Sequence, residues 1–460
     1  MMGQLPPDQN VLFYDFCLDK YVPDDHLLRR IDSLLDLSVL RQHFSTFYSH
    51  TGRPSVDPEL MIRMLLIGYC YGIRSERRLC EEVHLNLAYR WFCRLGLEGG
   101  IPDHSTFSKN RHGRFRDSDA FRCLFEDVVE RAIAIGLVRG EGFAVDASLI
   151  KADVCYERCI PGSELTTLDR EAVSEVVRRY LDTLDIDAGE KIPKKILLTD
   201  PYSRWATNRQ GAADFCYSAN YLVDTSWGMI LDVEATPANR AEEAASTRVM
   251  IDRVEARFEI TPQRLIGDTA YGSAPMLGWL VEDKAIEPHV PVWDKSERHD
   301  GSFSRREFQW NEQANEYRCP AGKALRSRQR RFIKQRTIVT KENTIIYRAR
   351  KADCEVCPLK PRCCPNTPAR KIPRSVHEAA RDVARHIVQT PEYQQSARER
   401  KKVEMLFAHL KRILKLDRLR LRGISGARDE FLLAATAQNL RRMAKLLSQP
   451  PPGYRIGVPV

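Results

Sequence analysis

The sequence predicts an α/β fold with a mixed sheet, preceded by a helical domain and interrupted by a Cys-containing, β-rich insertion. Three observations support this fold. Strand-like and helix-like runs alternate between residues 142 and 292, which is typical of α/β domains. Apolar residues recur with helical spacing between residues 27 and 139. Residues 294–390 break the pattern, being rich in Arg, polar residues and Cys.

Residues 1–140 are predicted to form a helical DNA-binding domain. Asp57 precedes Pro58 and an apolar run, the pattern of an N-cap followed by proline in the first turn. Ser75 and Asp103 precede two further helical runs. Short helices with exposed Arg and Lys suit a helix-turn-helix-like domain. A helical dimerisation or scaffold domain fits the same pattern.

The core elements follow in order along the chain. We expect a charged helical stretch over residues 164–184, a hairpin of strands at 214–224 and 229–236, and a helix at 241–258. A strand at 264–268, a helix at 274–284 and a strand at 286–292 come next. Residues 141–293 thus form the first part of the core. The insertion, 294–390, carries strand-like pieces at 331–339 and 344–349. Helices within 391–448 complete the core, running over 391–416 and 427–447, and 449–460 is expected to be a flexible tail.

Three acidic residues stand in settings that suit a metal-dependent phosphoryl-transfer site. Asp146 and Asp268 end short apolar strands, and Glu404 lies in the helix before residue 416. Hard carboxylate oxygens can hold divalent ions astride a scissile phosphate. Asp153, Asp200 and Asp232 are rival acids that lack an equivalent setting.

The helix around Glu404 has two stripes. Its apolar stripe predicts a buried face made of Val403, Leu406, Phe407, Leu410, Ile413 and Leu414. Arg400 and Lys411 lie four and seven positions from Glu404, so the three form a second stripe. Cations there could hold phosphates beside a metal-binding carboxylate. Ordinary ion pairs on a solvated face are the alternative.

Five of the 13 cysteines fall between residues 319 and 364, and the others are scattered, which argues against a disulfide framework. The predicted four-ligand metal set is Cys319, Cys354, Cys357 and Cys363, with Cys364 able to replace Cys363. Structural zinc is favoured, with an iron–sulfur cluster and no metal as alternatives. The insertion arginines Arg326, Arg328, Arg330 and Arg331 either follow a DNA backbone or form a solvated surface.

Composition bounds the function only loosely. The formal net charge of +10 favours a polyanionic partner, but it is modest for 460 residues. No N-terminal run has the pattern of a signal peptide, and the most apolar run, residues 60–71, contains Arg63. We expect a cytoplasmic, nucleoid-associated protein without a membrane anchor.

Several motifs resemble the DDE transposases of bacterial insertion sequences. They are Val-Asp-Ala-Ser at 145–148, Gly-Asp-Thr-Ala-Tyr-Gly at 267–272, and Arg-Lys-Lys-Val-Glu at 400–404 with Lys411. The lineage that the chain resembles has a β-rich insert between its second Asp and its Glu. Asp200-Pro201, residues 217–221 and residues 235–239 resemble it too, and residues 60–115 resemble the helical domain that often precedes its core. That lineage also has a Tyr-Arg-Glu-Lys signature around its Glu. One position departs from this signature, because Ala397 stands where its Tyr is expected.

The resemblance implies an RNase H-like core with Asp146, Asp268 and Glu404 as catalytic ligands of Mg²⁺ or Mn²⁺ and with Arg400 and Lys411 on DNA. It implies a transposase that binds the terminal inverted repeats of its element, cleaves there, and joins the ends to target DNA. The partners would be double-stranded DNA and further copies of the chain, as a homodimer or higher assembly. A transposase-derived DNA-binding regulator and a hydrolytic nuclease are the alternatives.

Overall fold

The structure is a computed structural model that describes residues 16–45, 47–48, 55–113, 115, 118–186, 192–207, 211–294, 297–298, 300–328 and 337–448. Two compact units divide the chain. The first contains residues 1–139, 146–260 and 402–460, and the second contains residues 140–145 and 261–401. The strand β1 (Gly142–Lys151) and the helix α15 (Pro391–Arg412) each contribute to both units.

The N-terminal part of the first unit is helical, as predicted. Its helices are α1 (Leu18–Tyr21), α2 (Leu27–Asp32), α3 (Ser38–Ser45), α4 (Pro58–Tyr71), α5 (Glu76–Leu85), α6 (Leu87–Phe92), α7 (His104–His112) and α8 (Ala120–Ala134). The predicted N-caps are confirmed, because the side chains of Asp57, Ser75 and Asp103 each accept a backbone N–H from the first turn that follows.

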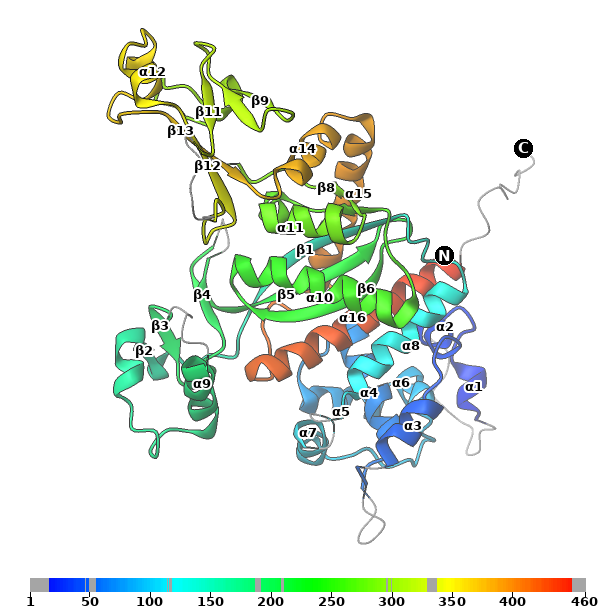
Figure 1. The fold of residues 1–460 in the computed structure, drawn as a ribbon. Coiled ribbons are helices and arrows are strands. Elements are labelled where there is room, and N and C mark those ends of the chain that lie inside the picture. The colour runs from blue at the N-terminus through cyan, green and yellow to red at the C-terminus, as the bar shows by residue number, and fades with distance from the viewer. Residues whose placement is uncertain are drawn as a thin grey trace, which may run out of the picture. The chain divides into compact units, whose positions relative to one another are not determined.

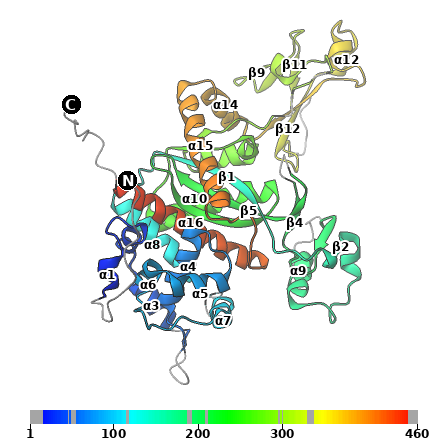
Figure 2. The same ribbon diagram turned by 180° about the vertical axis from the view of Figure 1, so that it is seen from behind.

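The helix α4 is buried on almost every side, and the C-terminal helix α16 (Gly423–Leu447) packs against both α4 and α8 (Figures 1 and 2). Arg441 donates a hydrogen bond of 2.8 Å to the carbonyl oxygen of Cys70, the second-to-last residue of α4. Just beyond α4, Arg74 forms an ion pair with Glu430 of α16, whose side chain is fully buried. The N-terminal helices therefore share a core with α16.

The strands of the first unit form an antiparallel set. β5 (Asp214–Asp224) pairs antiparallel with β4 (Arg204–Ala206) and with β6 (Met229–Pro237), and it also neighbours β1 in a six-stranded sheet. All residues of β5 are buried, and α10 (Arg240–Phe258) packs against β5 and β6. The predicted hairpin and the helix after it are confirmed almost to the residue, because a turn separates the two strands and the side chain of Asn239 caps the start of α10.

A small lobe of the first unit differs from the prediction. Residues 164–184 were expected to be one helical stretch, but they contain the 3₁₀ helix η2 (Gly162–Thr167), a connection and α9 (Glu175–Ile186). The lobe also holds η1 (Tyr156–Arg158) and the pair β2 (Cys159–Pro161) and β3 (Lys195–Leu197). It has a core of its own, formed by Leu165, Val177, Tyr180, Leu181 and Ile196. Three-residue strands have too few residues to show a period.

The second unit contains a parallel arrangement of short strands. The first half of β1 pairs with β7 (Arg264–Ile266), and β7 pairs with β8 (Glu287–His289). The strand expected over 286–292 is thus shorter than predicted. The helix expected over 274–284 is α11 (Ala274–Gly278) followed by a π-helical turn, η4 (Trp279–Asp283).

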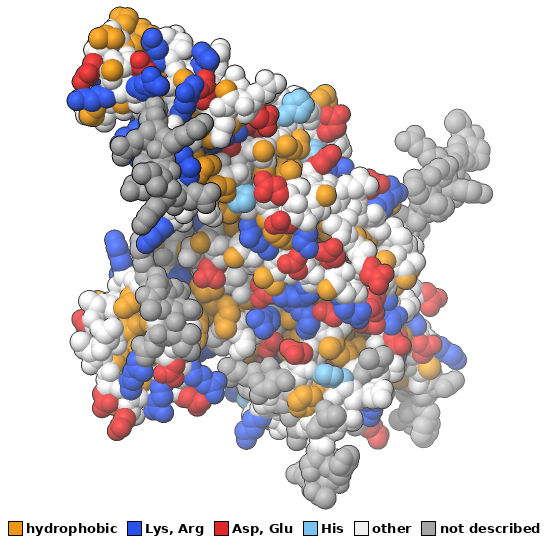
Figure 3. Space-filling model, viewed as in Figure 1, with side chains coloured by type: hydrophobic (Ala, Val, Ile, Leu, Met, Phe, Trp, Pro, Cys, Tyr) orange, Lys and Arg blue, Asp and Glu red, His pale blue; other side chains and the backbone are white. Residues whose placement is uncertain are grey.

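The insertion is a five-stranded antiparallel sheet in the order β13-β12-β11-β10-β9. Its elements are η5 (Arg305–Glu307), β9 (Gln309–Asn311), β10 (Glu316–Arg318), β11 (Ala324–Arg326), β12 (Thr344–Arg348), α12 (Lys351–Glu355), α13 (Lys360–Cys363) and β13 (Lys371–Ser375). The strand predicted over 344–349 is confirmed. Most of the piece predicted over 331–339 lies outside the described residues, as do Arg330, Arg331 and the C-terminal tail. Lys and Arg side chains are numerous at the α12 end of the insertion (Figure 3).

Two helices follow β13: α14 (Glu378–Ile387), which lies within the range 294–390 predicted for the insertion, and α15. Glu378 is buried and contacts the guanidinium groups of Arg305, Arg381 and Arg385, which ties η5 to α14. The helix expected over 391–416 ends at Arg412, four residues early. As a result Ile413, predicted on the buried face, is 49% exposed, while the other five residues of that face are buried. The last predicted helix begins at Gly423, four residues before residue 427.

Candidate active site and cysteine cluster

Asp146 lies inside β1 and not at its end, which corrects the prediction. The strand continues to Lys151 because that residue exchanges backbone hydrogen bonds with the segment after α15. Its N–H donates to Asp417 (3.1 Å), and its carbonyl accepts the N–H of Leu419 (2.7 Å). Pairing with β7, however, stops at Ala144. The Asp146 side chain is half-buried, and its Oδ1 accepts the N–H of Ala147 at 2.9 Å.

Asp268 follows the last residue of β7 by two positions and caps the 3₁₀ turn η3 (Thr269–Tyr271). Its Oδ1 accepts the N–H of Ala270 at 2.7 Å. The flanking glycines allow close packing, which explains the Gly-Asp-Thr-Ala-Tyr-Gly motif. A Cβ atom at Gly267 would lie 3.0 Å from the Tyr271 ring, and one at Gly272 would lie 1.9 Å from the carbonyl oxygen of Pro291. The acid is therefore held on a tightly packed turn.

This packing gives a stability prediction. Gly272→Ala should lower the free energy of unfolding by about 1–3 kcal/mol, because backbone atoms must move to admit the methyl group. Denaturant unfolding would measure the change. Gly100→Ala is the matched control, since a Cβ there meets nothing within 4 Å, and it should change stability by less than about 0.5 kcal/mol. Equal stability of the two variants would contradict the packing argument.

Glu404 lies on the exposed side of α15, between buried Val403 and buried Leu406. Arg400 and Lys411 are half-buried on the same helix. Burial lowers the pKa of the Lys411 ammonium group. The neighbouring Cys216 and Asp417 partly oppose this shift. A partly desolvated cation interacts more strongly with a phosphate than one that is fully solvated.

The three carboxylates are divided between the two units. Asp146, Glu404 and Lys411 belong to the first unit, and Asp268 and Arg400 belong to the second. Their convergence on one site stays a prediction. One regularity is local to the strands: the last β1–β7 pair is Ala144 with Ile266, and each Asp follows its paired residue by two positions.

The rival acids have structural contacts within the first unit. Asp232 is buried between Arg122 and Arg253, and Asp153 pairs with Arg422. Asp200 accepts hydrogen bonds from the hydroxyl of Tyr217 and from the N–H of Gly423. Burial raises the pKa of Asp200, although these donors oppose the shift. These contacts use the oxygens of the rival carboxylates in packing within the first unit.

The five insertion cysteines line one pocket of about 20 Å³, together with Lys323, Asp353, Lys360 and Arg370. The N–H of Lys323 donates to Sγ of Cys319 at 3.3 Å, in a tight turn that Gly322 closes with φ +74°. Burial is the main cause that raises the pKa of Cys363 to about 12, and the neighbouring Cys364 contributes to the same shift. In the described ranges, no three His, Cys, Asp or Glu side chains are arranged to hold a metal ion as they stand.

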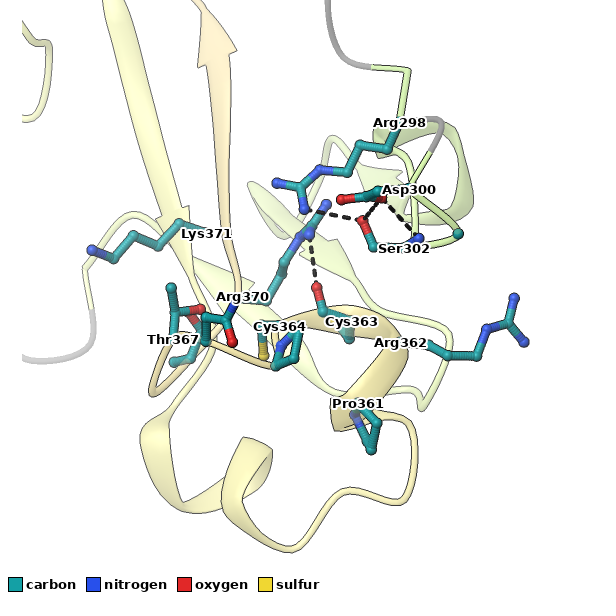
Figure 4. Close-up of a pocket in the computed structure, with 14 residues that line it drawn as sticks. Arg298, Asp300, Ser302, Pro361, Arg362, Cys363, Cys364, Thr367, Arg370 and Lys371 are labelled. Atoms are coloured by element: carbon teal, nitrogen blue, oxygen red, sulfur yellow. Dashed lines mark hydrogen bonds between the residues drawn. The ribbon is translucent and has the colours of Figure 1, made fainter.

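Arg370 lies between this pocket and a larger one of about 380 Å³, shown in Figure 4. The side chain is 6% exposed, and it donates to the carbonyl oxygens of Cys363 (2.8 Å) and Phe303 (2.7 Å). Its Nε is buried without a hydrogen-bond partner, and no carboxylate in the described residues forms an ion pair with it. Burial and the neighbouring Arg298 lower its pKa. The sequence analysis did not single out this residue, since a buried arginine has no pattern of its own.

Comparison with protein families supplies the deciding observation. Residues 16–113 match a transposase domain, DUF772, and residues 318–444 match a transposase DDE domain. The two matches support an insertion-sequence DDE transposase. The DDE match implies an RNase H-like core, in agreement with the mixed sheet, and an enzyme of the polynucleotidyl transferase or nuclease type that acts on DNA.

The second match spans the cysteine cluster, Glu404 and Lys411 of this transposase, whereas Asp146 and Asp268 lie outside it. Neither the curated proteins nor the solved structures that were searched gave a match. None of the helices in the described part of the chain combines the length and the apolar character needed to span a bilayer.

Proposed function

We propose that this transposase binds the terminal inverted repeats of its element, cleaves the DNA there and joins the exposed ends to target DNA. The observation that carries the proposal is the matched setting of the two aspartates. Asp146 and Asp268 follow the last β1–β7 pair by the same two positions. Glu404, on the exposed side of α15, lies within the DDE match.

The donor set fits divalent ions such as Mg²⁺ or Mn²⁺, because three carboxylates supply the oxygen ligands that these ions prefer. When bound, such ions activate an attacking oxygen and stabilise a leaving oxygen. Asp146, Asp268 and Glu404 would hold the ions. Arg400 would hold a phosphate through the two parallel donors of its guanidinium group, and Lys411 would hold one through the point charge of its ammonium group.

The experiment uses the purified protein and labelled duplexes that carry the ends of the element. Cleavage at the end with Mg²⁺, followed by joining to a second duplex, is the expected result. Cleavage without joining would favour the hydrolytic nuclease. Specific binding without cleavage would favour the regulator. Recognition of the ends is assigned mainly to the helices of residues 16–113, and pairing of two ends requires at least two copies of the chain.

We also propose that the cysteine cluster binds one structural zinc ion, through Cys319, Cys354, Cys357 and Cys363. The N–H that donates to the Cys319 sulfur is the kind of contact that supports a thiolate ligand. The pocket between the cysteines has room for about one small ion. Zinc binding would bring the four sulfur atoms together around the ion.

Charge supports thiolates over thiols at this place. Three cations, Lys323, Lys360 and Arg370, and one acid, Asp353, line the pocket, which leaves two positive charges in excess. Four thiolates around Zn²⁺ leave two negative charges in excess, so the two sets would balance. Buried Arg370, which lacks a carboxylate partner among the described residues, would then face a negative centre.

A further inference from the structure

The segment between α15 and α16 carries three exposed arginines in a row. Arg418, Arg420 and Arg422 are exposed, while Leu419 and Leu421 between them are buried. The segment bends at Arg420 and Leu421, and it runs beside the end of β1 through the hydrogen bonds at Lys151. The alternation of exposed and buried residues turns the three arginines toward solvent while the two leucines pack inward.

Buried carboxylates hold this segment in place. Oε1 of Glu430 accepts the backbone N–H groups of both Arg420 and Leu421, each at 2.6 Å, while Oε2 pairs with Arg74. Asp200, which is 1% exposed, accepts the N–H of Gly423 at 3.1 Å. The backbone under the arginines is therefore fixed before any ligand arrives, which lowers the entropy cost of binding.

The surroundings leave positive charge in excess. Arg422 pairs with Asp153 at 2.9 Å, and Asp214 lies 3.1 Å from Lys151 and 3.9 Å from Arg418. Arg420 forms no ion pair within the described part of the chain. The same neighbourhood includes Lys411, since Lys151, Lys411 and Arg418 all act electrostatically on Cys216. The row therefore lies near Lys411, the cation proposed above to hold a phosphate.

We propose that Arg418, Arg420 and Arg422, with Lys151, form a basic track that binds successive phosphates of double-stranded DNA. The inference rests on the proposed function and deepens it, because it assigns a DNA-contacting surface outside the signature residues. A guanidinium presents two parallel donors to a phosphate, and the fixed backbone keeps three such groups at the surface. Phosphate contacts carry no base information, so the track should serve element ends and unrelated DNA alike.

The test measures the affinity of the full-length protein for an element-end duplex and for an unrelated duplex over a series of salt concentrations, in EDTA so that no cleavage occurs. Arg420→Ala should weaken binding to both duplexes several-fold and reduce the slope of log K against log salt by about one. Arg420→Ala with Arg422→Ala should reduce it by about two. Arg420→Lys keeps the charge and should retain most of the slope.

Lys445→Ala is the matched control. It removes an exposed cation from the far end of α16, about 33 Å from Arg422 along the helix, and should leave both duplex affinities unchanged. An unchanged slope in the double variant, with the parent protein binding DNA, overturns the track and leaves the transposase assignment standing. A change confined to self-association would instead assign the arginines to a contact between copies. Reduced binding in a parent that never cleaves would keep the track and reject the enzymatic function.

Discussion

Replacement of Asp146 or Asp268 by Asn, or of Glu404 by Gln, is expected to lower metal-dependent cleavage and joining on the order of 10³-fold or more. Each change removes one negative metal ligand with almost no change of shape. Folding should survive, because Asn and Gln keep a side-chain oxygen that can accept the N–H groups of Ala147 and Ala270. DNA binding should survive too. Labelled element ends with Mg²⁺ and with Mn²⁺ would measure both activities.

Asp283→Asn is the control for these variants, since it neutralises an exposed acid at the end of η4 and should cleave like the parent. Arg400→Ala should reduce cleavage less than the carboxylate changes, because it removes a phosphate contact and leaves the metal ligands. Full activity in Glu404→Gln would remove this residue from the catalytic set. Loss of DNA binding along with cleavage would mean that the acids are structural.

Replacement of Cys354 and Cys357 by Ser is expected to abolish zinc binding and to unfold much of the insertion. The purified parent should carry about one zinc per chain, and structural zinc sites contribute folding free energy of roughly 10 kcal/mol or more in small domains. The core of the insertion is small, consisting mainly of Leu325, Tyr317, Tyr347 and Ile372 around the cysteines. It should therefore depend strongly on the metal. Metal analysis and protease sensitivity of residues 294–390 would measure the loss.

Two single variants test whether Cys363 or Cys364 is the fourth zinc ligand. Cys363→Ser should release zinc and Cys364→Ser should not, whereas the reverse result would exchange their roles. Cys123→Ser is the control, because this half-buried thiol lies on α8 and belongs to the other unit. Bound iron with visible absorbance in the purified protein would indicate an iron–sulfur cluster in place of zinc. A metal-free parent whose stability matches that of the double variant would eliminate the site.

The parts of the fold that the sequence predicts well are those with local causes. Asp57 caps α4 through a contact two residues away, and β5 and β6 are continuous buried runs joined by a short turn. The end of α15 depends on longer-range contacts. After the helix ends, the carbonyl of Asp417 and the N–H of Leu419 form hydrogen bonds with Lys151 of β1. No periodicity before residue 412 signals that partner. The same contacts extend β1 past Asp146.

The candidate site divides in the same way. The acids and the cysteines are recognisable by residue type and spacing, whereas Arg370 and Glu430 are not, since each acts through partners distant in sequence. The alternation of Arg and Leu over 418–422 matches the exposed and buried residues of that segment, but five residues are too few to predict its structure from sequence.

The contact between α4 and α16 has a consequence for synthesis of the chain. Arg74 and Glu430 are 356 residues apart, so the ribosome makes the arginine long before its carboxylate exists. Domains usually fold as they emerge, N-terminal first. Here the apolar surface of α4 stays uncovered until α16, near the end of the chain, has been synthesised. A gene copy interrupted before codon 423 should therefore yield an insoluble product and not a free N-terminal fragment able to occupy the element's ends. Damage late in the gene would silence the element without creating its own competitor.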